Sequence, residues 1–484
     1  MFLHPLLPQS RPRRWLAPLA MGFSLLLTAS ARPALAAPAA EFPVSDKTPA
    51  TAAEWKIGAP IVSYWAGPGF PGGGDVTDAA AAQMAAGGWN LVWCRENELD
   101  TVQRHGLRGM LSSNLLNPAS LEDLGKREAL EALVSRVKQH PGFYTYHLTD
   151  EPGASAFPAL GRLVAWLRER DPKHLAYINL LPTYASNEQL GVPGPPAEAY
   201  TRHLQQFVDT VRPSLLSYDH YQFTNSGDNP DYFLNLALVR SQALASGLPF
   251  MNIVQASTWV PTHLASPQSP RVPGPDEMRC LVYTTLAYGA QGISYYVYCY
   301  PGHEGGITKP DGTPTELYEA LKVLNPEFVR IAKELRPLHS LNVFHTGMKL
   351  PGTHPLPTDG PFHFDPPMPD MEFKPGDRAQ GLILSQFGPA AATVTAAGKK
   401  EDASASPAIS HVMVVNPDYK TAHTITLLAP AALDVFDASH GQWAPASVTS
   451  PAGVSNDAGS TAVTPGRTEL RLPPGGGILL RLRL

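Results

Sequence analysis

FYTYHLTDEPGASAFPALGRLVAWLRER, residues 143–170, joins a short apolar run to an amphipathic segment. The run 143–148 has the length and the aromatic content of a buried strand. Four apolar residues then recur at the helical spacing i, i+3, i+4 and i+7: Leu160, Leu163, Val164 and Leu167. Because this spacing places them on one helical face, the segment predicts a strand followed by a helix, the repeating unit of α/β proteins.

Seven further apolar runs alternate with amphipathic or polar stretches: 60–65, 89–94, 107–112, 175–180, 215–219, 250–254 and 292–298. After the last of them a second helical stripe follows: Leu317, Leu321, Leu324, Phe328, Ile331 and Leu335. We expect Pro326 to kink or divide that helix. Eight strand-helix units within residues 55–340 predict an α/β fold of the (β/α)₈ TIM-barrel type. A doubly wound sheet is the weaker alternative, because no Gly-rich phosphate loop follows the first run.

The composition changes near residue 341, where Pro-rich stretches lead into segments without a helical stripe. Residues 411–415, 424–428 and 480–484 are strand-like, and the last of these alternates with period two. Residues 341–484 therefore predict a C-terminal all-β sandwich domain. The small, polar segment 396–407 is expected to be a mobile hairpin loop within it.

The N-terminus carries arginines before an apolar stretch, and Ala34-Leu35-Ala36 follows it. This pattern predicts a signal peptide over residues 1–36 and a linker over 37–54, with Arg13-Arg14 leaving a twin-arginine signal open. We therefore expect an exported protein, periplasmic or extracellular. No later segment is long and apolar enough to span a bilayer, so no membrane span is expected in the mature protein.

Charge and cysteine content exclude several classes of partner. The formal charge is -5, from 37 basic and 42 acidic residues, so no broad cationic surface for nucleic acid is expected. The cysteines Cys94, Cys280 and Cys299 are too few for a disulfide framework and lack metal-ligand spacing, so we expect core residues. The sequence indicates no cofactor.

Two adjacent carboxylates, Asp150 and Glu151, end the fourth run. In a TIM barrel the active site lies at the C-terminal ends of the strands. Because side chains alternate along a strand, at least one of the two should point into the barrel mouth. A negative neighbour and partial burial would raise its pKa, as a general acid requires. The alternative is that the pair begins the next helix, where acidic residues and proline are favoured.

Polar and aromatic residues at the other strand ends are further candidates. Asp219 ends the sixth run and is a candidate catalytic carboxylate. Aromatic faces suit the apolar side of sugar rings, and polar groups suit hydroxyls. The candidate substrate-binding residues are Trp65, Trp93, Glu96, Asn114, His147, Asn179, Tyr184, His220, Tyr221, Gln255, Trp259 and Tyr298.

A metal site is a separate alternative. His147 and Glu151 have the same parity on a strand, so a divalent ion could lie between them, with Asp150, Asp219 and His220 nearby. No multi-histidine spacing supports this reading, and His147 could instead hydrogen-bond inside the barrel. We therefore predict no metal.

The sequence YHLTDEPG at 146–153, together with LAYGAQGISYY at 286–296, resembles barrel glycoside hydrolases over residues 58–340. The resemblance implies that Glu151 is the acid/base residue. In the retaining clan of families 42 and 5, an Asn precedes this Glu and a second Glu ends strand seven. This chain has Asp150 and Gln255 at those positions, and an amide cannot be a carboxylate nucleophile.

The Asp-Glu pair instead resembles the substrate-assisted families 20, 84 and 123. In those families the Asp orients a 2-acetamido group, whose carbonyl attacks the anomeric carbon while the Glu protonates the leaving oxygen. Asp150 and Glu151 inherit these roles by resemblance. A phenol holding the acetamido oxygen would be expected, and Tyr221 or Tyr298 could supply it.

Two other readings stay open. Asp219 or Glu96 could be a second enzymic carboxylate, with a separation of roughly 5 to 5.5 Å for retention or 6.5 to 9.5 Å for inversion. A secreted carbohydrate-binding barrel without catalysis, a pseudo-glycosidase, is favoured by Gln255 but disfavoured by the crowded Asp150 and Glu151. In each case the expected partner is an oligosaccharide or polysaccharide.

Overall fold

The computed structural model describes residues 60–389, 408–446 and 466–483. The predicted signal peptide, the linker over 37–54 and the loop over 396–407 lie outside the described residues. The described residues belong to one compact unit. Within this part of the chain, no helix is long and apolar enough to cross a membrane.

The first region is mixed α/β, with eight parallel strands in two four-stranded sheets. One sheet has the order β2 (Leu91–Cys94), β3 (Arg108–Leu111), β4 (Phe143–Asp150), β5 (Leu175–Asn179). The other has the order β1 (Ile61–Trp65), β9 (Gly292–Tyr296), β7 (Phe250–Gln255), β6 (Leu216–His220). Each of the eight predicted runs overlaps one of these strands, which confirms the strand prediction.

Hydrogen bonds join the two parallel sheets at both edges. Between β5 and β6, the Leu180 N–H donates to the Ser217 carbonyl at 2.8 Å. Between β1 and β2, the Asn90 N–H donates to the Val62 carbonyl at 3.1 Å, and the Val62 N–H donates to Asn90 Oδ1 at 3.0 Å. The strand order therefore continues from each sheet into the other.

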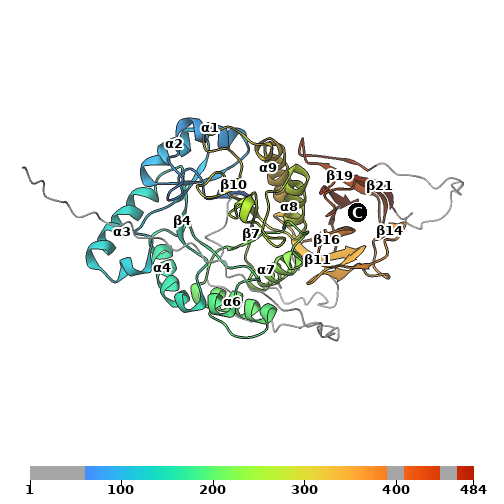
Figure 1. Ribbon diagram of the computed structural model, residues 1–484, viewed down its shortest axis with the longest axis horizontal. Coiled ribbons are helices and arrows are strands. Elements are labelled where there is room, and N and C mark those ends of the chain that lie inside the picture. Colours follow the sequence, from blue (N-terminus) through green and yellow to red (C-terminus); the bar gives the residue numbers. More distant parts are fainter. Residues whose placement is uncertain (1–59, 390–407, 447–465, 484) are drawn as a thin grey trace, which may run out of the picture. The chain divides into compact units, whose positions relative to one another are not determined.

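The connecting segments are mostly helical, and Figure 1 shows the longer helices on the outside of the parallel strands. The helices are α1 (Asp78–Ala86), α2 (Leu99–Arg104), α3 (Leu124–Val137), α4 (Phe157–Arg170), α5 (Asn187–Leu190), α6 (Pro196–Val211), α7 (Tyr232–Ser246), α8 (Pro275–Ala287) and α9 (Glu316–Leu335). Helix α4 contains the predicted stripe. Helix α9 continues through Pro326, so the predicted division is wrong. Its six predicted stripe residues are all buried, and this packing offsets the lost hydrogen bond of the proline.

The second region is β-rich. A seven-stranded sheet has the order β13 (His354–Pro355), β11 (His339–Thr346), β16 (Leu382–Gly388), β17 (His411–Val415), β22 (Gly477–Leu482), β19 (Leu433–Asp437), β20 (Gln442–Pro445). A three-stranded sheet has the order β14 (His363–Asp365), β18 (His423–Ala429), β21 (Gly466–Leu472). Both sheets contribute side chains to one separate hydrophobic cluster, for example Leu384 and Leu427.

Buried polar contacts join the β-rich region to the α/β region. The Tyr419 hydroxyl donates to Asp228 Oδ1 at 2.7 Å, and the Ala379 N–H donates to Asp228 Oδ2 at 2.8 Å. Asp228 lies in the loop that follows β6, so the β-rich region helps to hold that loop. Of the three cysteines, Cys94 and Cys280 are buried as predicted, and Cys299 is half-buried.

Candidate active site

The end of β4 has an unusual backbone conformation. Glu151 has a φ of 45°, a left-handed value that non-glycine residues adopt at a cost. Its N–H donates to the Asn179 carbonyl at 2.9 Å, which ties this turn to β5. The positive φ interrupts the alternation of the strand, and the side chains of Asp150 and Glu151 both interact with Asp219. The predicted alternative of a helix start is wrong, because α4 begins only at Phe157, after the short 3₁₀ helix η3 (Ala154–Ala156).

Asn179, at the end of β5, lies between two carboxylates. Its side-chain Nδ2 donates to Asp150 Oδ1 at 3.1 Å and to Asp219 Oδ1 at 2.9 Å. The Ser217 hydroxyl donates to Asn179 Oδ1 at 3.1 Å, so the amide cannot rotate without losing this bond. The structure thereby brings together residues from β4, β5 and β6. We call Asp150, Glu151 and Asp219 the carboxylate cluster.

The three carboxyl groups differ in their exposure. Asp150 and Glu151 are exposed, whereas Asp219 is only 4% exposed. Asp219 accepts the hydrogen bond from Asn179, and it interacts electrostatically with Glu151. Because Asp219 is buried and bonded to Asn179, it is the carboxylate of the cluster that the protein itself encloses.

The cluster shifts the pKa of its members upward. The surrounding protein raises the pKa of Glu151 most, and the negative charges of Asp219 and Asp150 raise it further. The pKa of Asp150 is raised by the same surroundings and by Asp219, while the Asn179 amide opposes the shift. Solvent reaches both side chains and lessens the effect of burial, but the neighbouring charges act in the same direction. The proton therefore stays on Glu151 above the ordinary glutamate pKa.

One group of aromatic residues lies beside the carboxylate cluster. The ring of Tyr221 is 4.8 Å from that of Trp259 and 5.1 Å from that of Tyr296, and Trp259 is 5.8 Å from Tyr296. The charges of all three carboxylates raise the pKa of Tyr296, after burial. Trp259 and Tyr184 are 38% and 49% exposed, so their rings are accessible to a ligand. The predicted candidates Tyr184, Tyr221 and Trp259 therefore share this neighbourhood.

A second aromatic group lies between the ends of β1, β2, β4 and β5. The His147 ring is 4.5 Å from Trp93, 5.5 Å from Trp65 and 6.1 Å from Tyr177. Burial lowers the pKa of His147 to about 3, so this histidine is neutral. Trp65 and Trp93 are 5% and 0% exposed, which makes them mainly packing residues.

Gln255, at the end of β7, is not the accessible substrate-binding residue that the sequence predicted. It is 0% exposed. Its Oε1 accepts from the Phe223 N–H at 2.8 Å, and its Nε2 donates to the Phe223 carbonyl at 2.9 Å and to the Arg271 carbonyl at 2.5 Å. The amide thus clamps the loops after β6 and β7, and no atom of it is left for a ligand. These contacts give the amide of Gln255 a structural role. The presence of Gln at this position therefore no longer favours the alternative of a carbohydrate-binding barrel without catalysis.

Two other predicted binding residues are buried. His220 is 0% exposed and its ring packs between Tyr184 and Tyr232. The Tyr298 hydroxyl donates to Gln83 Oε1 at 2.9 Å, and its side chain is 1% exposed. Strand β9 ends at Tyr296, two residues before the end of the predicted run, so the phenol at this strand end is Tyr296.

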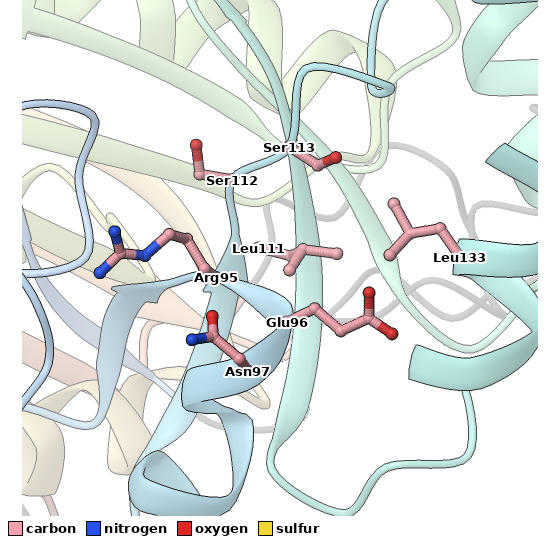
Figure 2. A pocket seen from close by; sticks show the side chains of 7 residues that line it. All are labelled: Arg95, Glu96, Asn97, Leu111, Ser112, Ser113 and Leu133. Carbon is pink, nitrogen blue, oxygen red and sulfur yellow. The ribbon is translucent and has the colours of Figure 1, made fainter. Parts of the chain in front are cut away.

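Glu96 and Asn114 lie at the ends of β2 and β3. Glu96 accepts from Arg136 Nη2 at 3.0 Å, an ion pair with helix α3 that lowers the pKa of Glu96. Figure 2 shows Glu96 beside Leu133, in a hollow that none of the three clustered carboxylates lines. Asn114 is exposed. Glu96 is therefore not the partner of Glu151 in this structure.

Sequence reasoning missed Tyr296 and Tyr177. Tyr177 lies inside β5, and its hydroxyl is 2.7 Å from Ser217 Oγ, one step from Asn179. Tyr177 and Asn179 are two residues apart on β5. Because side chains alternate between the two faces of a strand, this spacing could have placed both on one side. Within the described ranges, no group of three or more His, Cys, Asp or Glu residues is arranged to hold a metal ion.

The sequence matches no protein-family model and no curated protein. Solved structures show partial likeness, and those named here are glycoside hydrolases. A β-galactosidase from the psychrophilic Marinomonas ef1 has a TM-score of 0.38 at 13% identity, over 57% of this chain and 60% of its own. This chain therefore spans less than two thirds of that enzyme.

Two further structures cover more of their own length. A family 5 mannosidase from Rhizomucor miehei has a TM-score of 0.38 at 12% identity, over 58% of this chain and 96% of its own. A family 27 β-L-arabinopyranosidase from Geobacillus stearothermophilus has a TM-score of 0.44 at 10% identity, over 88% of this chain and 96% of its own.

Proposed function

We propose that the chain is a glycoside hydrolase in which Glu151 is the general acid and then the general base. The observation that carries this proposal is the place of Glu151 beside the buried Asp219, in a cluster where burial and then negative charge raise the pKa of Glu151. A general acid must be protonated near the working pH and accessible to the leaving oxygen. Glu151 is both, since it is exposed at the strand end.

Asp150 is the carboxylate proposed to face the substrate. Asp150 is exposed and accepts a side-chain hydrogen bond from Asn179, whereas Asp219 is buried. Asp150 is therefore free to accept the N–H of a 2-acetamido group, whose carbonyl oxygen would attack the anomeric carbon as Glu151 gives its proton to the leaving oxygen. Water would then open the cyclic intermediate and return a proton to Glu151. Tyr221 or Tyr296 would hold the acetamido oxygen.

Asp219 is proposed to position the other groups. As it is buried and accepts a hydrogen bond from Asn179, it is poorly placed to attack a sugar carbon. A two-carboxylate mechanism through Asp219 is thus less well supported than substrate assistance.

The proposal includes a fold and a location. The two edge-bonded parallel sheets support a closed (β/α)₈ barrel over residues 55–340, and the shared cluster of the antiparallel sheets supports a β-sandwich over 341–484. Strand β11 begins at His339, just before that boundary. The N-terminal pattern supports export to the periplasm or the medium.

A substrate screen tests the proposed function. The full mature chain is assayed on aryl glycosides of common sugars, with and without a 2-acetamido group, and the Glu151→Gln variant is the control. Cleavage of a 2-acetamido glycoside that Glu151→Gln reduces by about 100-fold or more is expected. Cleavage of no glycoside by the wild-type chain would contradict the proposal.

A further inference from the structure

A hollow of about 550 Å³ lies at the C-terminal ends of β2 and β3, apart from the carboxylate cluster (Figure 2). We call it the β2–β3 hollow and define it by its lining: Arg95, Glu96, Asn97, Leu111, Ser112, Ser113 and Leu133. Ligand pockets measure about 300–1,000 Å³. We propose that the β2–β3 hollow is a remote subsite for neutral sugar units of an oligosaccharide substrate, an inference that rests on the proposed function.

The charges of the hollow are neutralised within the protein. Arg95 pairs with Asp75 and with Glu98, whose Oε1 is 2.6 Å from Arg95 Nη2. Glu96 pairs with Arg136 of helix α3, at 3.0 Å. Since both charged residues of the lining have partners, the hollow offers no excess charge for a phosphate or a metal cation. This balance favours an uncharged ligand.

The free polar groups of the hollow suit sugar hydroxyls. Among the described residues, the Asn97 amide and the Ser112 hydroxyl make no hydrogen bond to the protein. The Ser113 oxygen accepts from the Leu115 N–H at 3.3 Å and keeps its own O–H to donate. Amides and hydroxyls both donate and accept, as sugar hydroxyls do. The hollow therefore presents a matching set of polar groups.

Apolar side chains complete the lining. Leu111 and Leu133 contribute to it, and Figure 2 shows Leu133 of helix α3 on the side opposite Asn97 and Ser112. Both leucines are buried, at 0% and 3% exposed, so they form the packed base of the hollow, and contacts to a sugar fall to its amide and hydroxyl groups.

The register of the sheet places the hollow on the same strand ends as the carboxylate cluster. Leu111 pairs with Tyr146 on β4, and Ser112 and Ser113 continue from it toward the same end. Asp150 lies four residues beyond Tyr146, roughly 13 Å along the strand at about 3.3 Å per residue. A short oligosaccharide with its reacting bond at the carboxylate cluster can therefore extend over β3 into the hollow.

Calorimetry on the full chain carrying Glu151→Gln tests the inference without turnover. The probes are β-1,4-linked oligomers of glucose, xylose, mannose and N-acetylglucosamine, from two to six units. In at least one series the affinity should rise by about tenfold or more with length, the worth of one or two added hydrogen bonds. Asn97→Trp, which fills the hollow, should remove this rise. So should the double variant Asn97→Ala/Ser112→Ala, which adds no bulk.

Gln103→Trp is the matched control, because Gln103 is an exposed amide on α2 outside the hollow. It should keep the rise. Affinity independent of length in all four series, or a rise that both hollow variants retain, would overturn the inference. If the binding results overturn the inference but the wild-type chain cleaves a two-unit substrate, the proposed function still holds. Length-dependent binding lost in the hollow variants, without cleavage of any glycoside, would instead overturn the proposed function alone.

Discussion

The carboxyl groups of Glu151 and Asp219 interact across the strand β5 that separates β4 from β6, and the negative charge of Asp219 adds to burial in raising the pKa of Glu151. One partner is exposed and the other is 4% exposed. The buried partner is held by Asn179, so its position is set by the sheet rather than by solvent. This relationship gives Glu151 a raised pKa and leads to the predictions below.

Asp219→Asn should move the alkaline limb of the pH profile of kcat/KM to lower pH. Activity needs protonated Glu151, so it is lost as the pH rises through the pKa of Glu151. Removing the charge of Asp219 removes part of the cause that raises this pKa. A pH series on one aryl glycoside measures the shift, with Asp100→Asn on α2 as a distant charge control. An alkaline limb that stays at the same pH or moves to higher pH would be evidence against the interaction between Asp219 and Glu151.

Asp150→Asn and Asp219→Asn should differ on a 2-acetamido substrate. If Asp150 stabilises the positive charge that develops on the acetamido nitrogen, Asp150→Asn should lower kcat by about 100- to 1,000-fold. Asp219→Asn, compared at its own pH optimum, should cost less, because Asp219 acts through Glu151. Glu96→Gln should cost less than Asp150→Asn as well, since Glu96 pairs with Arg136. A larger loss for Asp219→Asn than for Asp150→Asn would indicate a two-carboxylate mechanism.

The strand positions could be predicted from the sequence because eight buried runs carry a strong apolar signal. The direction in which each side chain points could not be predicted, because it depends on the residue at which each strand ends. The run 292–298 predicted Tyr298 as the strand-end phenol, but β9 ends at Tyr296 and Tyr298 bonds to Gln83 instead. The positive φ of Glu151 has no sequence signal, although it decides how Asp150 and Glu151 are placed.

The position of Gln255 in the sheet was predictable, but its partners were not. Its amide binds the backbone of Phe223 and Arg271, residues that the fold brings near from two separate loops. Such contacts have large sequence separation and leave no local pattern. The identity of Asn179 as the bridge between Asp150 and Asp219 was likewise visible only in the structure.

Gln255→Ala should lower the free energy of unfolding by about 1–3 kcal/mol, the cost of leaving buried partners unpaired. Urea unfolding followed by circular dichroism measures this. Gln255→Glu should give no covalent glycosyl-enzyme with a fluorosugar trap, because residue 255 is fully buried away from the carboxylate cluster. A labelled Glu at position 255 would show that this side chain can reach a substrate.

Glu151→Gln should raise the thermal midpoint of unfolding at pH 8 relative to the wild-type chain. The folded pKa of Glu151 lies above its unfolded value of about 4.3, so the folded state binds more protons between the two values. Stability is therefore lost as the pH rises through this window. The difference between variant and wild type should vanish near pH 4. Equal midpoints at both pH values would mean that the pKa is not raised.

The general-acid role of Glu151 is tested most directly by a leaving-group series. Wild type and Glu151→Gln are compared by kcat on 2-acetamido glycosides whose leaving phenols differ in pKa. The wild-type rate should depend little on the phenol, whereas Glu151→Gln should lose about 100-fold or more on poor leaving groups and much less on good ones. Equal losses across the whole series would contradict the assignment of Glu151 as the proton donor.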